Sequence, residues 1–336
     1  MTPAPARVDG SVSAEIGPIL AAGGPELAGL LERAERRLAQ VAEGHGPALG
    51  LHASRTTGAG GKRLRPMLVF LCGGAEGGDG LVRAGVAVEL VHTATLVHDD
   101  VLDRAALRRG RPTVYHEGGR EAATATGDLL FSRAFAELVA TGVAQSVRAL
   151  SSASSALARG ELMQRADAWS ATVTVERYLE RCRLKTARLF EAACRLGALI
   201  GAPGPEAAPR LGAYGDHIGV AFQIFDDVLD VSGPTERTGK ARGTDLLDGT
   251  VTLPLILARE RDPSLRSLDL RSAVTDAAAA EKVCDRIVAT GALEAARDRA
   301  LDFVAEAKME LERTTLQDRS REALRLVADG VVERYA

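Results

Sequence analysis

Two long apolar segments, residues 85–103 and 212–233, most constrain how this chain can fold. Both read as buried helices, and both carry the same acidic pentapeptide, DDVLD. Period-two alternation typical of strands is nearly absent. The apolar residues are mostly Ala, Leu and Val, and only 4% of all residues are aromatic, which favours helices packed closely through small side chains. The sequence therefore predicts an all-α protein.

The N-terminal residues differ in composition from the rest of the chain. Residues 1–22 are rich in Ala, Pro, Gly and Ser without a period, which predicts a flexible tail. A helical stripe comes next within residues 27–43, formed by Leu27, Leu30, Leu31, Leu38 and Val41. No linker divides the remaining chain, although 232–250 reads as a long loop. We therefore expect residues 23–336 to form one all-α domain.

Charge and cysteine content exclude several classes of protein. The 42 basic and 45 acidic residues leave a net charge of −3, so nucleic acid is not an expected partner. The four cysteines are scattered without a CxxC pair, which indicates reduced core thiols of a cytoplasmic protein. We expect no signal peptide and no membrane-spanning segment, and no basic amphipathic helix indicates a stable membrane anchor.

The first acidic motif lies in HDDVLDRAALRRG, residues 98–110. On a helix Asp99 and Asp103 share a face, with Asp100 beside them. Like charges at this spacing destabilise a bare helix, so a cation is expected to compensate them. Mg²⁺ prefers oxygen ligands and is commonly held by carboxylates together with substrate phosphates.

The second copy of the motif places Asp226, Asp227 and Asp230 on another apolar helix. One DDxxD alone is weak evidence, because solvated acidic turns often contain it. Two copies on the most apolar helices are stronger evidence, since buried unpaired carboxylates are costly. The pair predicts a site for several Mg²⁺ ions and a diphosphate.

Basic residues near these motifs could bind the phosphates. Each of them alone would be an ordinary surface charge, but arginine suits bidentate phosphate contacts and lysine a point-charge contact. There is no GxxxxGK[ST] sequence, so a P-loop is excluded. The candidates are Lys62, Arg63 and Arg65 on a glycine-hinged turn, Arg108 and Arg109 after the first motif, Lys185 beside Thr186 in a helix, and Lys240 in the long loop.

Several motifs in fixed order resemble the trans-isoprenyl diphosphate synthases, the polyprenyl synthetase family. They are GGKRLRP, VELVHTATLVHDDVLD with RRG, GD at 127–128, GELMQ, KTARLFEAA, FQIFDDVLD and GTDL. The resemblance runs from about residue 25 to the C-terminus. It implies the isoprenoid-synthase fold, a helical bundle around a deep central cavity, and a homodimer. It also implies Mg²⁺-dependent condensation of isopentenyl diphosphate with an allylic diphosphate, farnesyl or geranylgeranyl.

The resemblance also implies roles for individual residues. Asp99 and Asp103 would be direct metal ligands supported by Asp100, and Asp226 a ligand assisted through water by Asp227 and Asp230. Three Mg²⁺ ions per site are expected, with Mn²⁺ as a substitute. The residues implied to hold the allylic diphosphate are Arg108, Lys185, Thr186, Gln223 and Lys240. Those implied to hold isopentenyl diphosphate are Gly61, Lys62, Arg65, His92 and Arg109. Asp99, Asp103, Asp226, Lys185 and Lys240 would be catalytic.

One position departs from the family pattern. Gly249-Thr250 precedes Thr-Leu-Pro where the family commonly has Gly-Lys, so a phosphate-binding lysine is missing.

Product length in the family depends on the residues before the first motif, here Ala94 and Thr95. Five residues along a helix span about 7.5 Å, roughly one elongation step, and Ala94 is too small to block a growing chain. We therefore expect a product of about six to ten isoprene units. A floor near Phe131 or Phe135 would instead give a geranylgeranyl diphosphate synthase. A terpene cyclase and a non-catalytic partner subunit are further alternatives.

Overall fold

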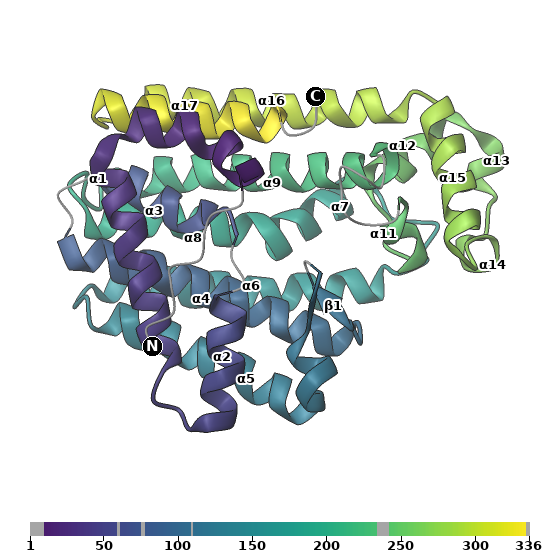
Figure 1. Ribbon diagram of the computed structural model, residues 1–336. Helices are drawn as coiled ribbons and strands as arrows, with labels where there is room; N and C mark the ends of the chain where they lie inside the picture. The colour runs from purple at the N-terminus through teal and green to yellow at the C-terminus, as the bar shows by residue number, and fades with distance from the viewer. Residues whose placement is uncertain (1–9, 59–60, 75–77, 109, 234–241, 334–336) are drawn as a thin grey trace. The chain divides into compact units, whose positions relative to one another are not determined.

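The computed structural model describes residues 10–58, 61–74, 78–108, 110–233 and 242–333. Nearly all regular structure in these ranges is helical, which confirms the predicted all-α fold (Figure 1). The α-helices are α1 (Gly10–Ala42), α2 (Pro47–Thr57), α3 (Leu64–Gly73), α4 (Gly78–Leu102), α5 (Val114–Val139), α6 (Ala144–Ala166), α7 (Val175–Cys182), α8 (Arg188–Ile200), α9 (Ala208–Ser232), α11 (Thr244–Leu247), α12 (Leu253–Arg261), α13 (Pro263–Arg266), α14 (Leu270–Ala273), α15 (Ala277–Ala289), α16 (Ala292–Glu312) and α17 (Asp318–Glu333). A π-helix, η2 (Arg183–Ala187), joins α7 to α8, and β1 (Leu107–Arg108) pairs with β2 (Arg111–Pro112).

The chain divides into two compact units, each built from separate stretches of sequence. Unit 1 comprises Met1–Ser152, Ala192–Gly212 and Arg313–Val327. Unit 2 comprises Ala153–Glu191, Ala213–Glu312 and Ala328–Ala336. The expectation of one domain over residues 23–336 stays a prediction.

Helix α4 forms the core of unit 1. It packs against α1, α2, α3 and α5. Because it is covered by several helices, side chains on nearly all of its faces are buried from Leu81 to Val91. By length and composition α4 could cross a membrane, but 72% of its most apolar stretch is buried inside the protein, as in the core helix of a folded domain.

Helix α1 starts earlier than the sequence predicts. Residues 10–22, which we expected in the tail, are helical, while residues 1–9 lie outside the described residues. Gly24 breaks the helical geometry with φ 78°, a value that glycine adopts without a side-chain clash. Ile19 is buried before this break, and the predicted stripe after it, from Leu27 to Val41, contributes to the core of unit 1.

Unit 2 contains the helices from α11 to α16, which come after the second acidic motif. Helix α12 packs against α7, α13, α15 and α16, and α11 packs against α15 (Figure 1). The greater part of α9, from Ala213 onward, belongs to this unit, and the core of the unit includes Tyr214, Ile218, Ile224 and Phe225. Both acidic motifs thus lie on buried helices, as predicted, and the structure places them near the C-terminal ends of α4 and α9.

Candidate active site

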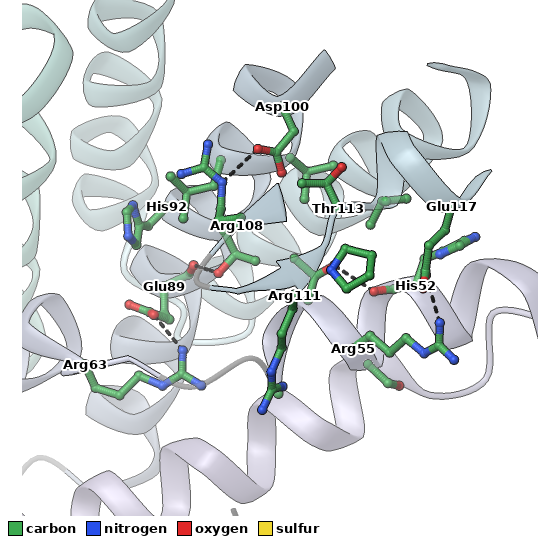
Figure 2. Close-up of a pocket in the computed structure, with 18 residues that line it drawn as sticks. His52, Arg55, Arg63, Glu89, His92, Asp100, Arg108, Arg111, Thr113 and Glu117 are labelled. Carbon is green, nitrogen blue, oxygen red and sulfur yellow. Dashed lines mark hydrogen bonds and ion pairs between the residues drawn. The ribbon is translucent and has the colours of Figure 1, made fainter. Parts of the chain in front are cut away.

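A cavity of about 390 Å³ opens in unit 1 between α2, α4, the β1–β2 hairpin and the start of α5 (Figure 2). One stripe of α4 lines it, which includes Glu89, His92, Thr93, Leu96 and Asp100. These positions recur every three or four residues, so they share a helix face. The cavity brings together four residues predicted for substrate or metal binding, namely Arg63, His92, Asp100 and Arg108.

The first acidic motif combines buried and accessible carboxylates. Asp100 is only 4% exposed, whereas Asp99 is half-buried and Asp103 is exposed. Helix α4 ends at Leu102, yet the Asp103 amide still donates to the Asp99 carbonyl over 2.8 Å. This bond continues the helical register, so Asp99 and Asp103 lie one turn apart on one face, as predicted.

Asp100 is held by Arg108 from the hairpin. The Arg108 Nε donates to Asp100 Oδ1 over 2.8 Å. Burial raises the pKa of Asp100, and the positive charge of Arg108 opposes that rise. The sequence did not predict the β1–β2 hairpin. In it the backbone of Arg108 lies opposite the backbone of Arg111, and Gly110 has φ 71°. Arg109 lies outside the described residues.

The glycine-hinged turn before α3 is organised by Arg63. Gly61 has φ 146° and Arg63 has φ 48°, so the backbone turns sharply before the helix starts at Leu64. The Arg63 guanidinium bonds Glu35 on α1, Glu89 on α4 at 2.7 Å and the Thr57 carbonyl at 2.8 Å. Burial lowers the pKa of Arg63, but Glu89 and Glu35 outweigh it and keep the pKa above its ordinary value.

Arg63 therefore anchors the turn that carries Lys62 and Arg65, both of them half-buried. In the sequence Arg63 stands out only as one of several basic residues. Its neighbours Glu35 and Glu89 are 28 and 26 residues away, so no local pattern indicated the network.

Two further arginines line the cavity without having been predicted. Arg111 reaches toward it from β2, and Arg55 on α2 pairs with Glu117 on α5 at 2.8 Å (Figure 2). Arg111 belongs to the run RRGRP, whose charge density was the available signal. The cavity wall therefore carries four arginines against three carboxylates, Glu89, Asp100 and Glu117, which leaves an excess of one positive charge toward an anionic ligand.

The second acidic motif lies on α9 in unit 2. Asp227 is 3% exposed, whereas Asp226 and Asp230 are half-buried. Tyr178 Oη donates to Asp227 Oδ2 over 2.6 Å, and Gln223 Nε2 donates to Oδ1 over 2.7 Å. Burial raises the pKa of Asp227 to about 7, and the two hydrogen bonds act against that rise.

The predicted diphosphate-binding residues Lys185 and Thr186 lie in η2, where the helix widens to a π-helix. Such local widening is frequent at functional sites. Thr186 Oγ1 donates to Gln223 Oε1 over 2.7 Å, and Lys185 Nζ pairs with Glu161 Oε2 at 2.5 Å. A Cβ on Gly160 would lie 2.6 Å from the Lys185 backbone nitrogen, so α6 approaches η2 closely only because this residue is glycine.

Asp230 holds the start of α11. Its two carboxylate oxygens accept from the backbone amides of Thr244, over 3.1 Å, and Asp245, over 3.2 Å. A carboxylate at a helix N-terminus satisfies donors that have no partner within the helix. The third aspartate of this motif thus contacts the GTDL sequence directly. Lys240 lies outside the described residues.

The departure at Thr250 lies next to a tightly packed glycine. Gly249 has φ 73°, and a Cβ there would lie 2.2 Å from the ring of Trp169. The Trp169 amide donates to the Gly249 carbonyl over 2.7 Å, and the Thr250 amide donates to the Asp245 carbonyl over 2.8 Å. Residue 249 must therefore be glycine, because a residue with a Cβ would be strained at this positive φ and the Trp169 ring leaves no space for the Cβ.

The predicted chain-length residues lie within α4. Ala94 is fully buried, and Thr95 Oγ1 donates to the His92 carbonyl over 2.7 Å. One turn further, His98 stacks on Phe131 with ring centres 5.8 Å apart. A Cβ on Gly127 would lie 2.2 Å from the His98 ring, which explains the glycine of the GD pair.

The six predicted metal ligands are divided between the two units, three in each. Within the ranges that the structure describes, no three His, Cys, Asp or Glu side chains gather closely enough to hold a metal ion. The donors nevertheless fit magnesium, because carboxylate oxygens one helical turn apart, as on Asp99 and Asp103, are the ligands that this hard cation prefers.

Comparisons with known proteins show the family to which the chain belongs. A family model described as polyprenyl synthetase matches residues 48–290. The chain is 40% identical over 283 residues to a heptaprenyl diphosphate synthase component 2 from Geobacillus stearothermophilus, with 82% of this chain and 87% of the relative covered. It is 36% identical over 285 residues to a geranylgeranyl diphosphate synthase from Methanosarcina mazei, with 82% and 86% covered.

Solved structures show the same fold. A polyprenyl synthase from Caulobacter crescentus, solved in complex with calcium and isoprenyl diphosphate, superposes with a TM-score of 0.84 at 33% identity. The match covers 98% of this chain and 100% of that chain. The likeness therefore extends well beyond the acidic motifs.

Proposed function

Because the chain belongs to the polyprenyl synthetase family, we propose that it is a trans-polyprenyl diphosphate synthase with a long-chain product. It is a prenyltransferase, which condenses isopentenyl diphosphate with an allylic diphosphate. We assign farnesyl or geranylgeranyl diphosphate as the allylic substrate. The chain length rests on Ala94, a small residue at the position where an aromatic one would stop elongation; in the structure Ala94 is fully buried in α4 and is not among the residues that line the cavity of Figure 2.

The reaction breaks the C–O bond of the allylic diphosphate, and both electrons leave on the diphosphate. The double bond of isopentenyl diphosphate attacks the resulting cation. A proton is then lost to the released diphosphate, which gives a trans product five carbons longer. The protein's task is to hold the two substrates and to exclude water from the cation.

The residues of this chain are suited to that task. Arg108, Lys185 and Thr186 bind the allylic diphosphate, while Lys62, Arg65 and His92 bind isopentenyl diphosphate. Existing partners fix several of them beforehand, since Asp100 orients Arg108 and Gln223 orients Thr186. Asp99, Asp103 and Asp226 would hold Mg²⁺, with Asp100, Asp227 and Asp230 supporting them. Bound Mg²⁺ supplies positive charge that stabilises the leaving diphosphate.

We also propose three Mg²⁺ ions per site, replaceable by Mn²⁺, a homodimer and a cytoplasmic location without a membrane anchor. One relative is named as component 2 of a heptaprenyl diphosphate synthase, so the oligomeric state of this chain is best measured directly. Light scattering on the purified chain would show a mass of about twice 35.3 kDa for a homodimer.

Product analysis tests the proposed chain length. The protein is incubated with Mg²⁺, labelled isopentenyl diphosphate and farnesyl or geranylgeranyl diphosphate, and the dephosphorylated products are sized by mass spectrometry. A ladder that ends at about six to ten units is expected. Replacing Ala94 with Phe should shorten it, and an unchanged ladder would contradict the role of Ala94.

A geranylgeranyl diphosphate synthase is the second candidate. It would require a cavity floor near Phe131 or Phe135, and Phe131 stacks on His98 with ring centres 5.8 Å apart. A relative with that name is 36% identical to this chain. If these rings form the floor, the wild-type ladder ends at four units and Phe131→Ala lengthens it.

A further inference from the structure

Tyr178 on α7 is a buried partner of the second acidic motif that no sequence pattern singles out. Its side chain has no solvent exposure. Its hydroxyl donates to Asp227 Oδ2 over 2.6 Å, across 49 residues of sequence. Because the ring is wholly buried, Tyr178 does not contact a substrate from solvent, and its hydroxyl reaches the acidic motif through Asp227.

A line of hydrogen bonds continues from Asp227. Its other oxygen, Oδ1, accepts from Gln223 Nε2 over 2.7 Å, and Gln223 Oε1 accepts from Thr186 Oγ1 over 2.7 Å. These partners fix the orientation of the Gln223 amide, because only its nitrogen can donate to a carboxylate. These hydrogen bonds therefore connect Gln223 and Thr186, two predicted diphosphate-binding residues, to Asp227 of the acidic motif. Tyr178 is the buried residue at the other end of this hydrogen-bonded chain.

Tyr178 is itself held firmly. Its amide donates to the Thr174 carbonyl over 3.0 Å in the first turn of α7. The Arg181 guanidinium lies 5.5 Å from the centre of its ring and donates to the Val251 carbonyl over 2.5 Å. A donor on such a fixed support restricts the rotation of the carboxylate that it binds.

We propose that Tyr178 is a positioning residue for the second acidic motif. An aspartate carboxylate rotates readily about its terminal bond, and hydrogen bonds to both oxygens remove that freedom. Tyr178 thereby holds Asp227, and through it Gln223 and Thr186, in the arrangement that receives a metal–diphosphate complex. The inference rests on the proposed function only in taking this motif to bind metal and diphosphate.

The test is Tyr178→Phe in the full-length protein, which removes one oxygen and preserves the ring. Binding of Mn²⁺ in the presence of inorganic diphosphate is measured by titration calorimetry. We expect the affinity to fall by about tenfold or more, the usual effect of losing a residue that orients a metal ligand. The Mg²⁺ concentration for half-maximal turnover should rise in parallel, while the KM for isopentenyl diphosphate stays within about twofold.

Tyr214→Phe is the matched control, because Tyr214 is also fully buried in unit 2. It should leave Mn²⁺ affinity unchanged whatever it does to the melting temperature. If Tyr178→Phe lowers only the melting temperature and metal affinity stays within about twofold of wild type, the tyrosine is merely structural and the proposal is overturned.

Asp227→Asn provides a second measurement that does not depend on Tyr178→Phe. It should weaken Mn²⁺ binding, and adding Tyr178→Phe to it should weaken binding no further, because the two residues act in series. Wild-type Mn²⁺ affinity in Asp227→Asn would overturn the proposal. If the wild-type protein elongates nothing but binds Mn²⁺ and diphosphate in a Tyr178-dependent way, the reaction assignment fails and this role stands.

Discussion

The same pentapeptide, DDVLD, occurs in both units, but the buried second aspartate of each copy has a different kind of hydrogen-bond partner. In unit 1 the buried Asp100 is paired with a cation, Arg108. In unit 2 the equivalent Asp227 is held by two uncharged donors, Tyr178 and Gln223. Burial raises the pKa of both carboxyls, but only Asp100 has a full opposite charge within hydrogen-bonding distance.

The difference shows that a short acidic motif does not determine its own electrostatics. A cation partner keeps a buried carboxylate charged, whereas uncharged donors stabilise the charge less well. The second motif therefore has the greater need for an additional cation at neutral pH, and the first is partly compensated within the protein.

The largest expected effect comes from the accessible aspartates of each motif. Asp99→Asn and Asp226→Asn should each lower kcat by about 10³-fold, because each removes a carboxylate proposed to hold the Mg²⁺ whose positive charge stabilises the leaving diphosphate. Steady-state turnover of isopentenyl diphosphate measures the loss, and circular dichroism verifies the fold. A loss at one motif alone would mean that the two do not serve one site.

Removing Arg108 should cost stability. Arg108→Gln leaves Asp100 buried without its cation, and we expect the free energy of unfolding to fall by about 2 kcal/mol, less than for a fully buried pair because Arg108 is partly exposed. Urea denaturation measures it. Adding Asp100→Asn should restore much of the loss, and no recovery would show that Arg108 stabilises through other contacts.

The pH dependence of stability should distinguish the two motifs. The pKa of Asp227, about 7 in the folded protein against an ordinary 3.8, means that the folded state binds this proton more tightly. The raised pKa therefore makes its full contribution to the free energy of unfolding below about pH 4, and this contribution is lost as pH rises toward 7. In metal-free buffer Asp227→Asn should gain about 1–2 kcal/mol over wild type between pH 5 and pH 7, measured by urea denaturation. A constant difference across that range would contradict the raised pKa.

The smallest expected effect is on the free energy of unfolding when the third aspartate of each motif, Asp103 or Asp230, is replaced. Asp230→Ala removes the acceptor for the first amides of α11 and should lower the free energy of unfolding by about 1 kcal/mol. Asp103→Ala, at an exposed position, should change it by less than about 0.5 kcal/mol. Equal effects of the two substitutions would show that the cap of α11 contributes little.

Much of the fold could be predicted from periodicity. The apolar segment at 85–103 corresponds to α4 and the segment at 212–233 to α9, although α4 begins earlier, at Gly78, and α9 begins at Ala208. The hairpin at Leu107–Pro112 and the π-helix at Arg183–Ala187 were missed. Strands of two residues and one widened helical turn are too short to produce a periodic signal.

The sequence by itself determined the helical class and the placement of both acidic motifs on buried helices, because apolar periodicity and the i, i+4 spacing are local properties of the chain. Only the tertiary structure decided which carboxylate meets which partner. Glu89 reaches Arg63 across 26 residues and Asp227 reaches Tyr178 across 49. Such pairings depend on how helices pack, and a buried charge is stabilised by whatever donor that packing brings to it.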